Sequence, residues 1–200
     1  MTRRLGRAFF ARPALAVARD LLGTRLVRLA GGTRLSGTIV ETEAYVGTED
    51  LGCHAKAGRT ARNDTMWGPP GHAYVYFTYG MHWMLNAVTE TDGHPGAVLI
   101  RAIAPEEGVE EMGRRRARPG RPGPPDRALA DGPAKLCQAL GISGTLDGAD
   151  LCAPGAELFV EEGAPVPDAQ IITGPRVGLN SVPEPWKSVP WRFRRAPGRG

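Results

Sequence analysis

The stretch TRLSGTIVETEAYVG at residues 33–47 decides the fold of this chain. It is rich in β-branched residues and alternates apolar with polar side chains, as is typical of a half-buried strand. Gly31 and Gly32 separate it from a similar stretch, TRLVRL at 24–29. The pattern therefore predicts two antiparallel strands joined by a tight turn.

The longer of these strands has an acidic face. Successive side chains of a strand point to opposite faces. One face therefore carries Val40, Thr42, Ala44 and Val46, and the other carries Glu41, Glu43 and Tyr45. The acidic face must look at water or into a cleft. The two carboxylates, about 7 Å apart at their Cα atoms, also fit the acid/base pair of a carbohydrate hydrolase.

Further strand candidates follow, separated by loops rich in Gly, Pro and Asp. Apolar or alternating stretches predict strands at 73–79, 81–88 and 96–104. Towards the end of the chain, three more short strands are predicted, in ELFVEEG, RVGL and WRFRR.

Three helices complete the prediction. Pro near the start and Gly just past the end predict helices at 13–23 and 131–141. In 106–118, glutamates precede arginines, so support of a surface helix is the favoured explanation of that arginine run, with a phosphate contact as the alternative. We expect an α+β (mixed α/β) fold: one compact domain, residues 1–200, with a curved, largely antiparallel sheet flanked by helices and a flexible Pro, Gly and Arg-rich loop at about 113–127.

Length and composition are those of a globular protein of one domain, because 200 residues suffice for a sizeable core and no apolar run approaches the roughly 18 residues of a membrane span. The chain carries 25 basic and 21 acidic residues, and all but three of the basic ones are Arg, which suits a polyanionic partner. Cys53, Cys137 and Cys152 are widely separated and lack histidines at zinc-ligand spacing. We therefore expect a reduced, cytoplasmic chain without signal peptide, metal or organic cofactor.

An arginine in the apolar stretch GAVLIRAIA indicates a catalytic pair. Arg101 would be costly to bury alone, so it demands a carboxylate, and a Glu of the neighbouring strand is the obvious candidate. A carboxylate beside a fixed cation can hold and deprotonate a water molecule. The class of reaction that this pair predicts is hydrolysis by general-base catalysis.

The stretch TYGMHW predicts an exposed hairpin tip. Gly80 permits a sharp turn that leaves Tyr79 and Met81 projecting, or else both side chains fold back onto the core. Projecting apolar side chains on a basic surface would serve an enzyme that unstacks a duplex and extrudes a nucleotide. Stacking aromatics such as Tyr45 and Tyr76 would receive that nucleotide.

Three blocks of the sequence resemble the alkyladenine (3-methyladenine) DNA glycosylase family: VETEAYVGTEDLGCHAKAGRTARND, AYVYFTYGMHWMLNAV and VLIRAIAPEEG. The resemblance covers roughly residues 9–195 and continues through GPAKLCQALGI and PRVGL to PWRFRR. It implies a single mixed α/β domain with a curved antiparallel sheet. It also implies excision of damaged purines, alkylated or deaminated, from double-stranded DNA after the nucleotide is flipped out. We expect a monomer that binds no membrane and needs no metal or cofactor, because water is the nucleophile.

The resemblance also implies roles for individual residues. Glu43 is similar to the general base that activates water for attack at the sugar C1′, Arg101 would help to hold that water, and Glu41 would be supporting. The residues expected to form the base pocket are Tyr45, His54, Tyr76 and Asn86, the last crowding the exocyclic amine of normal guanine. The residues expected at the DNA are Tyr79 and Met81 in the duplex gap and, more weakly, Arg62, Asn63 and Lys135 at the phosphates.

Three rival functions stay open from the sequence. A glycosylase with lyase activity would need an amine nucleophile, for which Lys56 is the lysine nearest to the pocket residues. A carbohydrate hydrolase would use Glu41 and Glu43 as an acid/base pair. A duplex-binding module without catalysis would use the arginines and the Tyr79 wedge alone.

Overall fold

The centre of the molecule is β2 (Thr33–Val46), the strand that the sequence singled out. In the computed structural model, which describes residues 2–120 and 123–197, one edge of β2 pairs along its length with β5 (Gly96–Glu107). The other edge pairs first with β1 (Arg25–Ala30) and then, from Glu41 to Glu43, with β8 (Arg192–Arg195). This strand therefore joins the beginning, middle and end of the chain.

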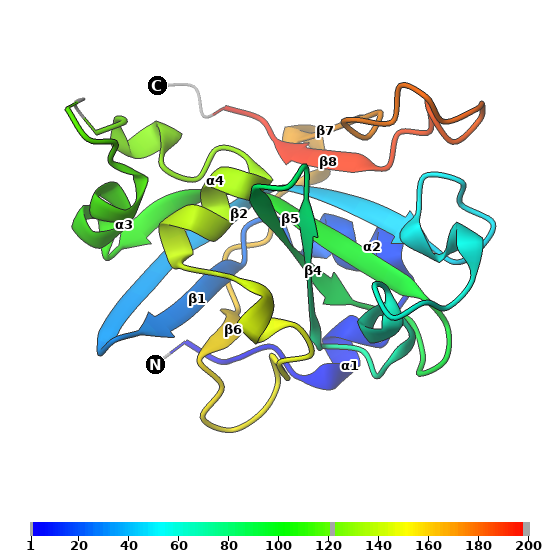
Figure 1. Cartoon of the computed structure of the whole chain (residues 1–200), viewed down its shortest axis with the longest axis horizontal. Helices are drawn as coiled ribbons and strands as arrows, with labels where there is room; N and C mark the ends of the chain where they lie inside the picture. Colours follow the sequence, from blue (N-terminus) through cyan, green and yellow to red (C-terminus); the bar gives the residue numbers. More distant parts are fainter. Residues whose placement is uncertain (1, 121–122, 198–200) are drawn as a thin grey trace.

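The described residues contain one sheet of eight strands, and every strand pair in it is antiparallel. The remaining strands are β3 (Ala73–Thr78), β4 (His82–Val88), β6 (Leu158–Glu161) and β7 (Ile171–Gly174). The order is β3-β4-β5-β2-β1-β6, with β8 on β2 and β7 on β8. Figure 1 shows β7 and β8 at the top of the view, above β2. The prediction of a largely antiparallel sheet in an α+β fold is confirmed.

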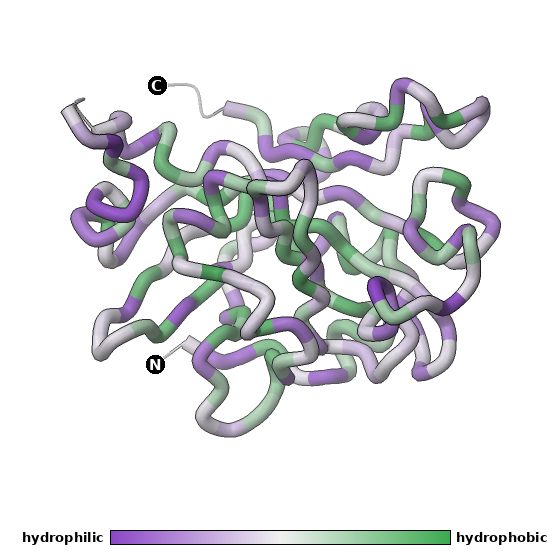
Figure 2. The backbone as a smooth tube through the Cα atoms, viewed as in Figure 1, coloured by the Kyte–Doolittle hydropathy of each residue, from purple (hydrophilic) through white to green (hydrophobic). Residues whose placement is uncertain are grey.

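Within residues 2–120 and 123–197, four α-helices pack around this sheet. They are α1 (Arg7–Phe10), α2 (Ala14–Asp20), α3 (Val109–Arg116) and α4 (Pro133–Leu140). Helix α2 contacts β2 and β5, α4 contacts β4 and β5, and α3 packs on α4. The buried residues of α2, α4 and the strands form the main hydrophobic core, and Figure 2 shows the contrast between these apolar elements and the hydrophilic α3. No helix in the two described ranges is both long and apolar enough to cross a membrane.

The predicted glycine stop is confirmed for α4 and is wrong for α2. Gly141 directly follows α4 with a φ of +63°, the left-handed conformation in which glycine ends a helix. Gly23 also has a positive φ, +84°, but α2 already ends at Asp20, and the Gly23 N–H donates to the carbonyl of Ile39 instead.

In α3, Glu110 and Glu111 form ion pairs with Arg114 and Arg115 one turn later. The helix-support explanation is therefore confirmed for Arg114 and Arg115, whereas Arg116 bonds to Gln138 and Arg118 lies beyond the helix.

Three expectations are wrong at the level of residues. Glu106 and Glu107 belong to β5, so the helix expected at 106–118 begins at Val109, and the first four residues of the loop expected at 113–127 are helical. That loop also contains a short 3-10 turn at Asp126–Ala128, and its residues 121–122 lie outside the described ones. The expected strand RVGL is a turn instead, because Gly178 takes a φ of +83° that no strand tolerates.

A pair of bulges corrects the predicted faces of β2. Ile39 pairs with Ile103 and Glu41 with Ala102, so Val40 is the extra residue of a bulge. One step later Thr42 pairs with Ile100, which makes Arg101 the extra residue on β5. Ile39 therefore enters the core on the side of Thr42 and Ala44, and Val40 is left only half-buried.

Thr42 ties α2 to the sheet. Its hydroxyl donates a 2.7 Å hydrogen bond to the carbonyl of Ala18, near the end of α2, where carbonyls lack partners within the helix. We expect Thr42→Val, which keeps the shape but leaves this buried carbonyl unsatisfied, to lower the free energy of unfolding in urea by about 1–3 kcal/mol. The same change at the exposed Thr33 of the same strand should alter it by less than about 0.5 kcal/mol, and equal effects would contradict the assignment.

Candidate active site

A cavity of about 300 Å³ opens where β2, β3, β4 and β5 meet the loops after β2 and after β7. Several aromatic side chains line it, together with one cation and one buried amide. The residues that the sequence predicted and that line it are Tyr45, His54, Tyr76, Tyr79, Asn86 and Arg101. The sheet therefore brings most of the predicted site residues together.

Glu43 lies directly behind the wall of this cavity, with no exposed surface. Its Oε1 accepts a 2.7 Å hydrogen bond from the backbone N–H of Val177. Its Oε2 accepts a 2.9 Å hydrogen bond from the Tyr45 hydroxyl and lies 3.3 Å from Nη1 of Arg101. All three partners line the cavity. The carboxylate therefore lies immediately behind the lining residues, with a partner on each of its oxygens.

The surroundings of Glu43 make it a stronger base than a surface carboxylate. Burial raises the pKa of Glu43, while Arg101, the Val177 N–H and the Tyr45 hydroxyl oppose that rise by stabilising the charged form. Burial and the neighbouring Glu43 also raise the pKa of Tyr45 well above its usual range, which keeps this phenol a hydrogen-bond donor. A carboxyl group with a raised pKa that still ionises is suited to take a proton from water near neutral pH.

Arg101 is shared between two carboxylates. Its Nε donates a 2.7 Å hydrogen bond to Glu41, and its Nη1 faces Glu43. Glu41 also lies 3.8 Å from Arg192 of β8, and it lines a separate surface depression rather than the aromatic cavity. The predicted pairing of Arg101 with a glutamate of the neighbouring strand is confirmed, and Glu41 orients the cation that faces Glu43.

Three aromatic rings cluster on one part of the cavity wall. The His54 and Tyr76 rings meet edge-on with centroids 4.6 Å apart, and Tyr74 lies 5.4 Å from Tyr76. The His54 Nδ1 and the Tyr74 hydroxyl share a 2.9 Å hydrogen bond. Burial, with lesser effects from Arg62 and Lys56, lowers the pKa of His54, and burial raises the pKa of Tyr76 to about 12. The wall is therefore uncharged near neutral pH and offers flat π faces.

The hairpin between β3 and β4 projects beside the cavity. Tyr79 and Gly80 both have positive φ, +52° and +66°, and the N–H of Met81 closes the turn on the carbonyl of Thr78. The side chains of Tyr79 and Met81 are 78% and 68% exposed, so the alternative that they fold back onto the core is wrong. A tyrosine in the left-handed region is uncommon and strained, which points to a functional rather than a structural role.

The remaining predicted residues fall into two groups. Asn86 is buried, and its Nδ2 donates to the Tyr74 carbonyl, which fixes the amide at the cavity wall. Arg62 is exposed with its guanidinium 5.8 Å from the Tyr76 ring, and Lys135 is exposed and paired with Asp131. Asn63 is buried instead, with its amide hydrogen-bonded to the backbone of His54, Gly58 and Thr60. Its expected phosphate contact is therefore wrong, because its side chain is used inside the loop.

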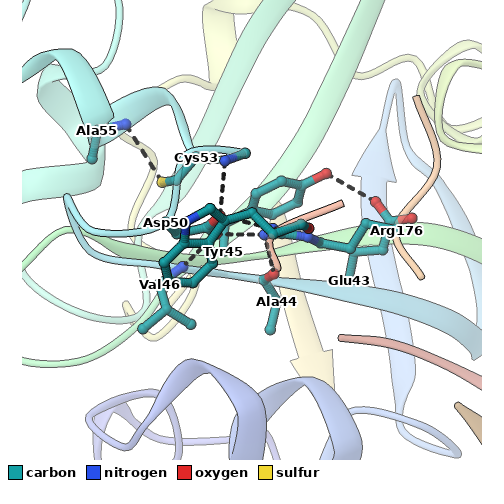
Figure 3. A network of polar contacts seen from close by, with 10 residues as sticks. Glu43, Ala44, Tyr45, Val46, Asp50, Cys53, Ala55 and Arg176 are labelled. Carbon is teal, nitrogen blue, oxygen red and sulfur yellow. Dashed lines mark hydrogen bonds and ion pairs between the residues drawn. The ribbon is translucent and has the colours of Figure 1, made fainter. Parts of the chain in front are cut away.

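Sequence reasoning missed several residues of the site. The sequence predicted no role for Tyr74, although its alternation with Tyr76 on β3 brings both rings to the same cavity. Val177 and its neighbour Arg176 were missed because RVGL resembles a strand. Figure 3 shows Arg176 beside Asp50 in the polar network that includes Glu43 and Tyr45. The arginine that begins RVGL is the signal that could have found this ion pair, since an arginine at the start of a predicted buried strand demands a carboxylate.

Two further residue sets bear on the chemistry. Lys56 is exposed in the 3-10 turn His54–Ala57 and lies outside the cavity lining. Within the part of the chain that the structure describes, no group of three or more His, Cys, Asp or Glu side chains is placed to bind a metal ion. The groups that the cavity does present are a held carboxylate, a cation and a set of aromatic faces.

The comparisons with known proteins agree on one family. A family model described as "Methylpurine-DNA glycosylase (MPG)" matches residues 8–197. A protein from Methanocella arvoryzae, named "Putative 3-methyladenine DNA glycosylase", is 50% identical over 97% of this chain and 98% of its own length. Proteins of the same name from Carboxydothermus hydrogenoformans and Desulfitobacterium hafniense are 47% and 45% identical, over 94% and 96% of this chain and 93% and 94% of their own lengths. With its aromatic cavity and its held glutamate, this chain belongs to the methylpurine-DNA glycosylase family.

Proposed function

We propose that this protein is a monofunctional, monomeric DNA glycosylase. It flips an alkylated purine such as 3-methyladenine out of double-stranded DNA and hydrolyses the N-glycosidic bond, leaving an abasic site. The observation that carries the proposal is the buried Glu43, held by Val177, Tyr45 and Arg101 directly behind an aromatic cavity. Family membership supports the same reaction class.

The base in this reaction is Glu43. Arg101 and Val177 both contact the carboxylate and both line the cavity, so the proposed place of the attacking water is the cavity wall between them, in front of Glu43. Glu43 takes the proton as the water oxygen attacks C1′ of the flipped nucleotide, and the purine leaves with the electrons of the glycosidic bond. Alkylation makes the purine a better leaving group, so the carboxylate has less of the barrier to lower.

The cavity suits a flat, electron-poor base. Its volume of about 300 Å³ lies at the lower end of small-molecule sites, and its aromatic faces favour stacking of a cationic alkylated ring. Tyr45, His54 and Tyr76 would form its walls. The anchored amide of Asn86 would exclude normal guanine by crowding the exocyclic amine, since rejecting undamaged bases matters as much as binding damaged ones.

The exposed hairpin would occupy the gap that the flipped nucleotide leaves. Tyr79 lines the cavity mouth and projects from the surface with Met81, so one short turn links the DNA stack to the base pocket. Arg62 and Lys135 would contact phosphates, and such contacts position the enzyme without reading sequence.

The geometry counts against two of the rival functions. A carbohydrate hydrolase needs both carboxylates beside its substrate, but Glu41 faces Arg101 and Arg192 outside the aromatic cavity. A lyase needs its amine at C1′, but Lys56 is exposed outside the cavity lining. The position of Glu43 favours hydrolysis with water as the nucleophile.

Replacing the proposed base tests the function directly. We expect Glu43→Gln to slow release of 3-methyladenine from methylated duplex DNA by about 100-fold or more, because general-base catalysis is lost. Affinity for the same DNA should persist. The matched change Glu41→Gln on the same strand should slow release at least tenfold less. Equal losses would support the acid/base pair of a carbohydrate hydrolase, and unchanged release would exclude Glu43 as the base. Absence of release by the wild type would leave only the binding module.

The hydroxyl of Tyr45 should set part of the pH dependence. Glu43 must be ionised to act, so the rate falls as the pH drops through its pKa. Tyr45→Phe keeps the ring but removes the donor that lowers the pKa of Glu43, so that pKa rises further. The acidic limb of the single-turnover rate should move to higher pH by up to about one unit. The matched change Tyr76→Phe removes a different hydroxyl of the same cavity, and it should leave the acidic limb at the pH of the wild type.

The strained turn should separate stability from function. Asn tolerates the positive φ of Tyr79, so Tyr79→Asn should leave the free energy of unfolding unchanged or raise it by up to about 1 kcal/mol. Base release from duplex DNA should nevertheless fall about tenfold, because unstacking is no longer compensated. Release from the same lesion in a single strand should change little, and an equal fall on both substrates would contradict the wedge.

A further inference from the structure

Arg176 and Asp50 form an ion pair that is completely buried beside the proposed active site. Both side chains have no exposed surface. The guanidinium reaches both carboxylate oxygens, with Nη2 2.7 Å from Oδ1, and Asp50 also accepts hydrogen bonds from the backbone N–H groups of Val46 and Gly52. Burying such a pair gives little or no net stability compared with apolar residues of similar volume. Its position is therefore the feature to explain.

The ion pair contacts β2 at Ala44, the residue between Glu43 and Tyr45. Nη1 of Arg176 donates a 3.0 Å hydrogen bond to the carbonyl of Ala44, as Figure 3 shows. The guanidinium carbon also lies 4.7 Å from the Tyr45 ring centroid, at cation–π distance. Asp50 holds the end of the same strand through the N–H of Val46. Both members of the pair are thus fastened to the strand that carries the proposed base.

The pair also fixes the loop that holds Glu43 from the other side. Residues 175–191 are all described, and they contain no helix or strand. Arg176 directly precedes Val177, whose N–H donates 2.7 Å to Glu43. Its guanidinium packs so closely on Gly52 that a Cβ there would lie 2.7 Å from Nη2. Anchoring the side chain of Arg176 therefore places the next backbone N–H.

We propose that Arg176 and Asp50 are positioning residues: their ion pair holds the Val177 N–H on Glu43 and the Tyr45 ring in the cavity wall. The proposal rests on the proposed function, in which Glu43 is the base. Arg176 acts through these two neighbours, since it is buried behind the wall and outside the cavity lining. Loss of the pair frees the loop, and Glu43 then loses the hydrogen bond on Oε1.

The test is the double variant Arg176→Met with Asp50→Asn. It removes both charges, so the net charge is unchanged and no buried charge is left alone, and Asn still accepts from Gly52. The matched control is Arg7→Met with Asp150→Asn, which removes a partly exposed ion pair outside the cavity lining. Three quantities are measured: the Tm, the pKa of Glu43 by ¹³C NMR of its carboxyl carbon without DNA, and the single-turnover rate against pH.

We expect the double variant to keep its Tm within about 5 °C of the wild type. The pKa of Glu43 should rise by about one unit, because the Val177 N–H no longer stabilises the carboxylate, and the acidic limb of the rate should move with it. The rate at that limb should fall about tenfold. Glu43 keeps its other charged and titratable neighbours in both variants: Glu41, Tyr45, Tyr76 and Arg101. The control should change none of these quantities.

An unchanged pKa of Glu43 in the folded double variant would overturn the proposal. A fall in rate no larger than the loss of folded protein that the lower Tm accounts for would overturn it as well. If the double variant fails to fold, Arg176→Lys, which keeps the charge but loses the two-pronged contact, is measured in the same way and must raise the same pKa. The NMR result is independent of catalysis. Absence of base release by the wild type would therefore refute the proposed function alone, whereas normal release with an unmoved pKa would refute the positioning role alone.

Discussion

The whole site depends on one constraint, which is that a carboxylate is buried without any contact with solvent. Removing an ionised group from water costs several kcal/mol, and that cost is offset only where its partners are fully in place. For Glu43 the partners come from three parts of the chain: Tyr45 on the same strand, Arg101 on the neighbouring strand and Val177, which is 134 residues away. Once buried, this carboxylate can therefore be charged only where all three partners are in place.

The sheet meets this constraint through the central position of β2. Its pairing with β5 carries Arg101 to the site, and the adjacent bulges at Val40 and Arg101 shift the register there. Its pairing with β8 along Glu41 to Glu43 brings back the end of the chain and, just before it, the loop that contains Val177. Because bulges change which residues oppose one another, the position of the cation depends on an irregularity of the ladder rather than on its regular repeat.

What could be predicted from the sequence is what local chemistry dictates. An arginine inside an apolar strand needs a carboxylate, and this need identified Arg101 and its glutamates without knowledge of the register. The exposed hairpin and the glycine that ends α4 follow equally from local backbone rules. The bulges and the Asp50–Arg176 pair did not follow, because periodicity does not encode register and because those two residues meet across 126 positions of sequence. Asn63 was misjudged for the same reason, since its partners are set by the path of its loop.

The two ends of the site have opposite mechanical characters, and the proposed reaction needs both. The carboxylate end is rigid, because Glu43 is held at both oxygens and its neighbours are themselves held by buried charges. The hairpin end is exposed, and Tyr79 has a backbone conformation that its side chain disfavours. A general base that takes a proton from the attacking water must be placed within a fraction of an ångström. A wedge, in contrast, must enter a DNA stack that varies in sequence. Neither the strain nor the buried charges stabilise the protein, so the apolar core between the sheet and helices α2 and α4 has to supply the stability that the site does not.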